Sequence, residues 1–119
     1  INLTHNVSAV TGACLCIDHN KFDEVGGFDD ENLKVAFNDV DLCMKLTSHG
    51  YYNLIVPSVV LVHHESYTRG MEDTKNKKQR FAKEIKFMQN KWGVKLLNDP
   101  FYNPNLSLDN EQCMFTMKR

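Results

Sequence analysis

Residues 37–50 have the sequence FNDVDLCMKLTSHG, which predicts a helix with both of its ends marked. Asn38 is a favoured N-cap residue, and Asp39 and Asp41 follow in the first turn, where negative charge is stabilised by the helix dipole. Two leucines four residues apart predict a buried stripe, and Gly50 is typical of a residue that ends a helix. The rest of the fold is predicted outward from this helix.

Three apolar segments around the helix predict strands. The segment Val7–Asp18 predicts a buried strand, and Gly12 within it indicates close approach of another backbone or a ligand. Tyr51–Val56 and Val59–His63 predict two more strands. The last segment has four consecutive aliphatic residues, so we expect it to be covered on both faces. A helical turn is expected at His19–Val25, and the pattern indicates the α/β class.

A long amphipathic helix is predicted from about Glu72 to Trp92. Its apolar stripe, which we expect to pack in the core, consists of Phe81, Ile85, Met88 and Trp92. After Gly93 the chain is rich in proline and asparagine, so an extended tail is expected from about 93 to 119. Together, residues 1–119 are expected to form a single domain fragment.

Composition limits the classes of function. The chain has 119 residues, 42% of them hydrophobic, and a net charge of −1, which excludes general disorder. Its pI near 6.6 disfavours a nucleic-acid binder, and no apolar run reaches the ~20 residues of a transmembrane segment. The four cysteines lack the spacing of a disulfide framework, which favours a reducing, cytoplasmic environment.

Asp39 is the first candidate for chemistry. A carboxylate held by backbone N–H groups at a helix N-terminus can face a cleft and act as a general base toward a substrate hydroxyl. Ordinary helix capping explains the same residue, and spacing alone favours that interpretation. The letters Asp-Val-Asp also match a short metal-binding motif, but residues two apart on a helix point about 200° apart and do not readily share one ion. We therefore do not interpret Asp39 and Asp41 as a metal pair.

A second group of candidates follows the apolar strand. His63 and His64 lie at its end, where open α/β sheets usually bind ligands, and a histidine there can contact a metal or a phosphate. Arg69, next to a glycine, can clamp a phosphate. A hydrogen-bonded structural histidine and a plain surface arginine are the alternative interpretations.

The order of these motifs is more specific than any one of them. The quoted segments are 10–15 (VTGACL), 25–29 (VGGFD), 38–43 (NDVDLC), 50–51 (GY), 63–66 (HHES) and 69–70 (RG), with Pro57 and the tail 99–106. Over about residues 7–106 this succession resembles the C-terminal, acceptor-side half of family-2 inverting glycosyltransferases. The closest likeness is to bacterial polysaccharide-building, rhamnosyltransferase-like members. The resemblance implies a Rossmann-like A-type glycosyltransferase domain with a short mixed sheet packed against helices.

The resemblance also implies roles for particular residues. It makes Asp39 the catalytic base that takes the acceptor's hydroxyl proton. The residues that it implies in substrate or acceptor binding are Gly12, Gly27, Phe28, Asn38 and Asp41. The residues that it implies near the diphosphate or the metal are His63, His64 and Arg69, with His63 the one candidate metal ligand. The substrates implied are a nucleotide-diphosphate sugar and a glycan or lipid-linked acceptor.

The same resemblance implies a partner region outside this sequence. Members of the family hold the nucleotide, and a divalent cation such as Mg²⁺ or Mn²⁺, mainly with an N-terminal half. We therefore expect this chain to be a fragment that binds no metal tightly and has no glycosyl-transfer activity alone. Self-association through exposed sheet edges is expected. The expected location of the parent is cytoplasmic, at most peripheral to the inner face of the membrane.

Two other classes of function remain open from the residues. One is a non-catalytic interaction or scaffold domain that keeps the fold without the chemistry. The other is a small metal-dependent hydrolase that uses the cluster Asp39, Asp41, His63, His64 and Glu65. Tightly bound metal in the purified chain would favour the hydrolase, whereas loss of activity on changing Asp39 in the parent would exclude the scaffold.

Overall fold

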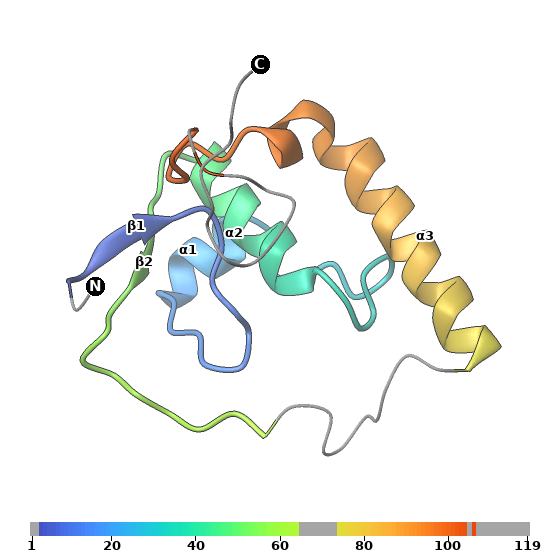
Figure 1. Cartoon of the computed structure of the whole chain (residues 1–119), viewed down its shortest axis with the longest axis horizontal. Helices are drawn as coiled ribbons and strands as arrows, with labels where there is room; N and C mark the ends of the chain where they lie inside the picture. The colour runs from blue at the N-terminus through green and yellow to red at the C-terminus, as the bar shows by residue number, and fades with distance from the viewer. Residues whose placement is uncertain (1–2, 65–73, 105, 107–119) are drawn as a thin grey trace.

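The computed structural model describes residues 3–64, 74–104 and 106 (Figure 1). The elements, in chain order, are β1 (His5–Val7), α1 (His19–Glu24), α2 (Asn38–Ser48), β2 (Asn53–Ile55), α3 (Lys75–Trp92) and the 3-10 helix η1 (Gly93–Leu97). The described part is thus mixed α/β, as the sequence predicts. Its sheet consists of β1 and β2, which pair antiparallel with His5 opposite Ile55.

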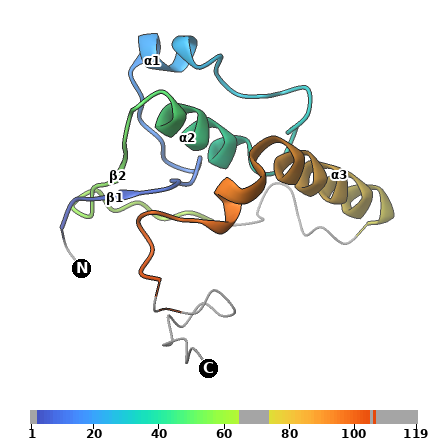
Figure 2. The same ribbon diagram turned by 90° about the horizontal axis from the view of Figure 1, so that it is seen from above.

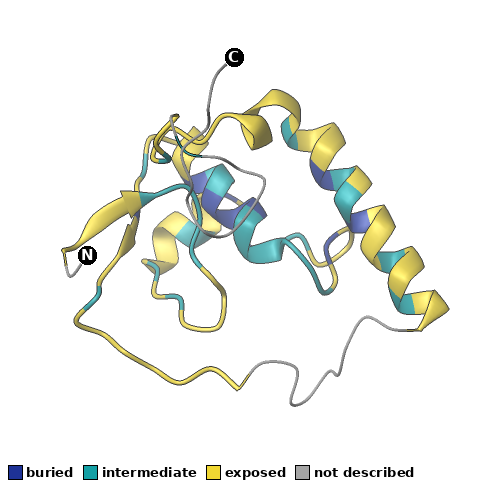
Figure 3. Ribbon diagram, in the orientation of Figure 1, coloured by how far each residue is buried: buried dark blue, intermediate teal, exposed yellow. Residues whose placement is uncertain are grey.

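Helix α2 lies between the two-stranded sheet and α3, in both views of the ribbon (Figures 1 and 2). Two of its buried side chains, Leu42 and Leu46, pack with Val25 in an apolar cluster. Leu15 and Ile17, from the segment before α1, cover this cluster in part. Figure 3 shows buried residues concentrated on α2, with few on α3. The core is therefore small and centred on the helix that the sequence marks most clearly.

The predicted helix is confirmed, but its predicted N-cap is wrong. Asn38 is the first helical residue, and Phe37 occupies the cap position with a left-handed backbone (φ 65°) and no side-chain cap hydrogen bond. The N–H of Asp41 donates to the carbonyl oxygen of Phe37 at 2.8 Å, so helical hydrogen bonding begins one residue earlier than predicted. Gly50, with φ +86°, follows the helix end as expected.

The predicted strand Val7–Asp18 is wrong beyond its first residue. Residues 8–18 contain no strand, because no described strand pairs with them. Backbone N–H groups of this segment instead donate to α2: Val10 to the Cys43 sulfur at 3.5 Å and Gly12 to the Asp39 carboxylate at 2.7 Å. Cys14 and Cys16 are both exposed.

The strand predicted at Tyr51–Val56 is confirmed over Asn53–Ile55 only. The strand predicted at Val59–His63 is wrong, as is its burial: residues 59–62 are 63–82% exposed. A turn precedes this segment, in which the N–H of Val59 donates to the carbonyl oxygen of Val56 at 3.1 Å. No described strand pairs with the residues that follow. The sheet of the described residues is accordingly antiparallel, and the expected mixed sheet is not formed within them.

The long helix is confirmed as α3, beginning at Lys75 rather than Glu72. Thr74 is its N-cap and accepts a hydrogen bond from the N–H of Lys77, while Glu72 lies outside the described residues. Met88 is buried, as the apolar stripe predicts, but Phe81 is 36% exposed. The tail is extended only in part, because η1 follows α3 directly. None of the helices in the described ranges is long and apolar enough to cross a membrane.

Candidate functional site

Asp39 lies in the first turn of α2 and is half-buried. Its Oδ2 accepts the N–H of Gly12 at 2.7 Å, and its Oδ1 accepts the N–H of Val40 at 2.9 Å. A Cβ at Gly12 would lie 3.4 Å from the Cβ of Asp39, so the glycine lets the loop approach the carboxylate closely. Within residues 3–64 and 74–104, no lysine or arginine pairs with Asp39. Its carboxylate is thus oriented by backbone groups, and no cation of the described residues neutralises it.

Cys43 lies one turn further along α2 and is completely buried. Burial raises the pKa of its thiol; the hydrogen bond from the N–H of Val10 offsets part of this shift, and the negative charge of Asp39 adds to it. The Cys43 thiol is therefore protonated at neutral pH. It serves to hold the 8–12 segment against α2 and not as a nucleophile.

Asp41, two residues from Asp39, has an entirely different environment. Its side chain is 0% exposed and receives three donors. Lys91 Nζ lies 2.8 Å from Oδ1, Trp92 Nε1 donates to Oδ1 at 2.8 Å, and Lys45 Nζ lies 3.3 Å from Oδ2. Asp41 therefore joins the first turn of α2 to the last turn of α3, and its oxygens do not face a cleft.

The two lysines extend this network to the loop after α1. Lys45 donates to the carbonyl oxygen of Gly27, and Lys91 Nζ lies 3.8 Å from the carboxylate of Asp29. Burial alone would raise the pKa of Asp29, but hydrogen bonds from Asn32 and the charges of Lys91 and Lys45 outweigh it, so the pKa is lowered. We call the set Asp29, Asp41, Lys45, Lys91 and Trp92 the Asp41 network.

The predicted acceptor residues of the glycine loop lie beside this network. Gly27 is buried and has φ +61°, and its backbone approaches the ring of Phe22 so closely that a Cβ would lie 2.8 Å from Cε1. Phe28 is 44% exposed and packs edge-on against Phe22, with 5.4 Å between ring centroids. Asn38 is half-buried at the start of α2. The loop is therefore packed against Phe22 of α1.

A broad hollow of about 970 Å³ separates the 9–18 segment from residues 51–63. Thr11 and Ala13, which flank Gly12, line it on one side, and His63 lines it on the other. The structure thus brings one predicted diphosphate-binding histidine to the same hollow as the loop that contacts Asp39. His64 is exposed and does not line the hollow, and Arg69 lies outside the described residues.

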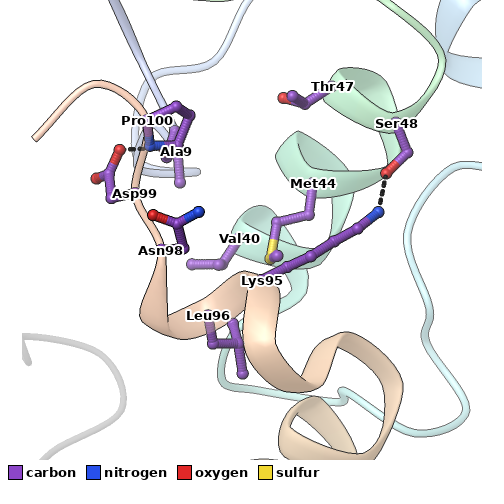
Figure 4. Close-up of a pocket in the computed structure, with 11 residues that line it drawn as sticks. Ala9, Val40, Met44, Thr47, Ser48, Lys95, Leu96, Asn98, Asp99 and Pro100 are labelled. Carbon is purple, nitrogen blue, oxygen red and sulfur yellow. Dashed lines mark hydrogen bonds between the residues drawn. The ribbon is translucent and has the colours of Figure 1, made fainter.

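A second, smaller hollow of about 340 Å³ lies between α2 and the residues that follow α3 (Figure 4). Val40 and Met44 form its apolar wall on α2, and Lys95 crosses it to donate to Ser48 at 3.3 Å. Asp99 closes another side, where it accepts the hydroxyl of Ser8. Since its polar groups largely bind one another, this hollow mainly marks where the chain after α3 docks on α2.

The described donor groups do not form a metal site. In the part of the chain that the structure describes, no three side chains of His, Cys, Asp and Glu come together as a metal site. Asp39 and Asp41 face different partners, and the hydrolase cluster is not assembled among its described members. Glu65, its fifth member, lies outside the described residues.

Sequence reasoning missed the residues that connect α3 to the site. Glu84 is 2% exposed and accepts the N–H groups of Val35 and Ala36 at 3.0 and 3.4 Å. The signal for Glu84 was present, since a carboxylate lies within the apolar stripe of α3, next to Ile85 and four residues before Met88. No comparable signal marked the lysine and tryptophan at the end of α3 as partners of Asp41.

Comparison with known proteins gives relatives that are much longer than this chain. The chain is 44% identical over 119 residues to uncharacterized protein y4gI of Sinorhizobium fredii, covering all of this chain and 13% of that protein. It is 32% identical over 111 residues to the O-antigen biosynthesis protein RfbC of Myxococcus xanthus, covering 92% of this chain and 8% of that protein. It is 35% identical over 66 residues to the N-acetylglucosaminyl-diphospho-decaprenol L-rhamnosyltransferase of Mycobacterium tuberculosis, covering 56% of this chain and 21% of that protein.

The chain therefore spans about a fifth or less of the length of these relatives. No family model matches it. No solved structure matches it. Of the three relatives, one is named as a rhamnosyltransferase and one for O-antigen biosynthesis, which agrees at a coarse level with the resemblance found in the sequence.

Proposed function

We propose that this chain forms the acceptor-side part of a glycosyltransferase catalytic domain that works in bacterial polysaccharide synthesis, with Asp39 as the general base. One observation carries the proposal: Asp39 is a half-buried carboxylate at a helix N-terminus, oriented by two backbone N–H groups and paired with no described cation. The names of the distant relatives support the same class of reaction.

In the proposed reaction, the acceptor hydroxyl attacks the anomeric carbon of a nucleotide-diphosphate sugar. The new C–O bond forms as the bond from the anomeric carbon to the phosphate oxygen breaks on the opposite face, so the configuration inverts. The hydroxyl proton passes to a carboxylate oxygen of Asp39, and the electron pair leaves with the nucleoside diphosphate. Positioning of the two substrates supplies much of the rate enhancement.

The remaining predicted site residues take supporting roles in this proposal. Gly12 sets the distance between the 9–18 loop and the base, while Gly27 and Phe28 shape the acceptor side. His63 is proposed to meet the diphosphate, and its position on the hollow that Thr11 also lines supports this role. The Mg²⁺ or Mn²⁺ of such enzymes neutralises charge on the leaving diphosphate. The described residues assemble no set of ligands for this ion.

The parts of the enzyme that hold the nucleotide are proposed to belong to the full-length protein, outside these 119 residues. The donor is then a nucleotide-activated hexose or deoxyhexose, and the acceptor a glycan or a lipid-linked sugar. A cytoplasmic site of action, at most peripheral to the membrane, is part of the same proposal.

The test is glycosyl transfer by the full-length protein with Asp39→Asn, beside the exposed control Asp30→Asn. Nucleoside diphosphate L-rhamnose and synthetic N-acetylglucosaminyl-diphospho-prenol are the first pair of substrates. A panel of other nucleotide sugars follows, with release of nucleoside diphosphate as the readout. A general base contributes about 10²–10⁴-fold to the rate, so Asp39→Asn is expected to lose at least a hundredfold in kcat. Full activity in Asp39→Asn would refute the assigned role.

A further inference from the structure

The first turn of α2, which carries Asp39, lacks the usual support of a helix start. No side chain caps it, and Phe37 precedes it with a left-handed backbone that a bulky residue rarely adopts. Backbone strain of this kind persists only where the surroundings impose it. The structure must therefore hold this turn by contacts from other elements.

Those contacts come from three successive positions along α3. Phe81 stacks on Phe37 with 5.4 Å between ring centroids. Glu84, one turn on, accepts N–H groups from the residues just before Phe37. At the end of α3, Lys91 and Trp92 bind the buried carboxylate of Asp41. In Figures 1 and 2, α3 runs beside the loop that leads into α2.

The geometry points to Lys91 and Trp92 as positioning residues for Asp39. Asp41 is two residues further along the same helical turn, so its rotation and that of Asp39 are linked through the rigid backbone. The contacts of Asp41 with Lys91 and Trp92 hold the first turn of α2 against α3. The hydrogen bond from the Gly12 N–H to Asp39 shows that the Asp39 carboxylate points toward the 9–18 segment. We call this support of the first turn of α2 by Lys91 and Trp92 the bracing. The inference rests on the proposed function only for the catalytic role of Asp39, and the bracing itself does not depend on it.

The bracing predicts a measurable change at the Gly12 amide in the 119-residue chain. Trp92→Phe keeps an aromatic side chain but lacks the Nε1–H. Lys91→Met keeps a long, flexible side chain but lacks the charge. Loosening of the first turn is expected to raise the hydrogen-exchange rate of the Gly12 amide about fivefold or more in both variants. The matched control is Lys86→Met, because Lys86 is an exposed lysine of α3 outside the Asp41 network.

An internal reference separates positioning from general destabilisation. The Asn20 N–H donates to the Asp18 carboxylate at 2.9 Å and caps α1, remote in sequence from α3. Positioning requires that the Gly12 amide accelerates while the Asn20 amide does not. Equal acceleration of both amides, or none at Gly12, would overturn the inference.

The full-length protein provides an independent readout. There, Lys91→Met and Trp92→Phe are expected to lower kcat about tenfold with the KM for the donor unchanged, while Lys86→Met keeps both. A kcat unchanged in Lys91→Met and Trp92→Phe would overturn positioning. If the Gly12 amide responds but Asp39→Asn keeps full activity, the bracing stands and the proposed function fails, so the two failures are distinguishable.

Discussion

Replacement of Asp41 by asparagine tests the Asp41 network most directly. The side chain of Asp41 is 0% exposed, and those of Lys45 and Lys91 are 15% and 29% exposed. Asparagine keeps an acceptor for Trp92 but loses the charge that binds both lysines. A hydrogen bond to a charged group is worth about 1.5–3 kcal/mol, which we reduce to about 1 kcal/mol for each partly solvated lysine.

Asp41→Asn is therefore expected to lower the free energy of unfolding by about 2 kcal/mol. Asp41→Ala also leaves Trp92 Nε1 without its acceptor, so about 3–5 kcal/mol is expected for it, as for other broken buried pairs. With a urea m-value of about 1–2 kcal/mol/M, the midpoint should fall by about 1–2 M in Asp41→Asn.

Urea denaturation of the 119-residue chain, followed by far-UV circular dichroism, measures this shift. Asp30→Asn is the matched control, since Asp30 has the same charge and is exposed. The control should lie within about 0.5 kcal/mol of the unchanged chain. A midpoint for Asp41→Asn equal to that of the control would refute the buried network and the bracing built on it.

Three further predictions concern the loop after α1 and the sheet. Gly27→Ala should destabilise the fold by about 2–4 kcal/mol in urea denaturation, because strain at φ +61° adds to a contact of 2.8 Å with Phe22. Gly26→Ala, with φ +78° and open space, should cost only about 1–2 kcal/mol; equal losses would exclude the clash. Asn53→Ala should cost about 2–3 kcal/mol by thermal denaturation, since the buried amide donates to three acceptors; a loss below 0.5 kcal/mol, roughly the surface value, would contradict this. The lowered pKa of Asp29 contributes stability that is complete above about pH 4 and is lost as pH falls through the folded-state value. Asp29→Asn should therefore flatten the acid limb of a stability-against-pH curve, and an unchanged limb would rule this out.

The sequence by itself determined which segments form α1, α2 and α3 and where α2 ends, although it misplaced the first residues of α2 and α3. Gly50 ends α2 and the apolar stripe of α3 faces inward for reasons that act over a few residues: backbone conformation, capping and side-chain periodicity. It also placed Asp39 in the first turn of α2. The strands were predicted less well, because a strand is stable only when another strand pairs with it. The apolar run at 59–62 has no such partner among the described residues, so it is exposed.

The tertiary structure alone decided what the acidic residues of α2 do. Asp39 and Asp41 are indistinguishable as capping carboxylates in the sequence. Among the described residues, however, Asp39 accepts two backbone N–H groups, whereas Asp41 is buried among two lysines and a tryptophan. Lys91 and Trp92 are 50 and 51 residues from Asp41 along the chain. Local propensity carries no information over such a distance, because only packing of α3 beside α2 brings these groups together and removes the carboxylate from water.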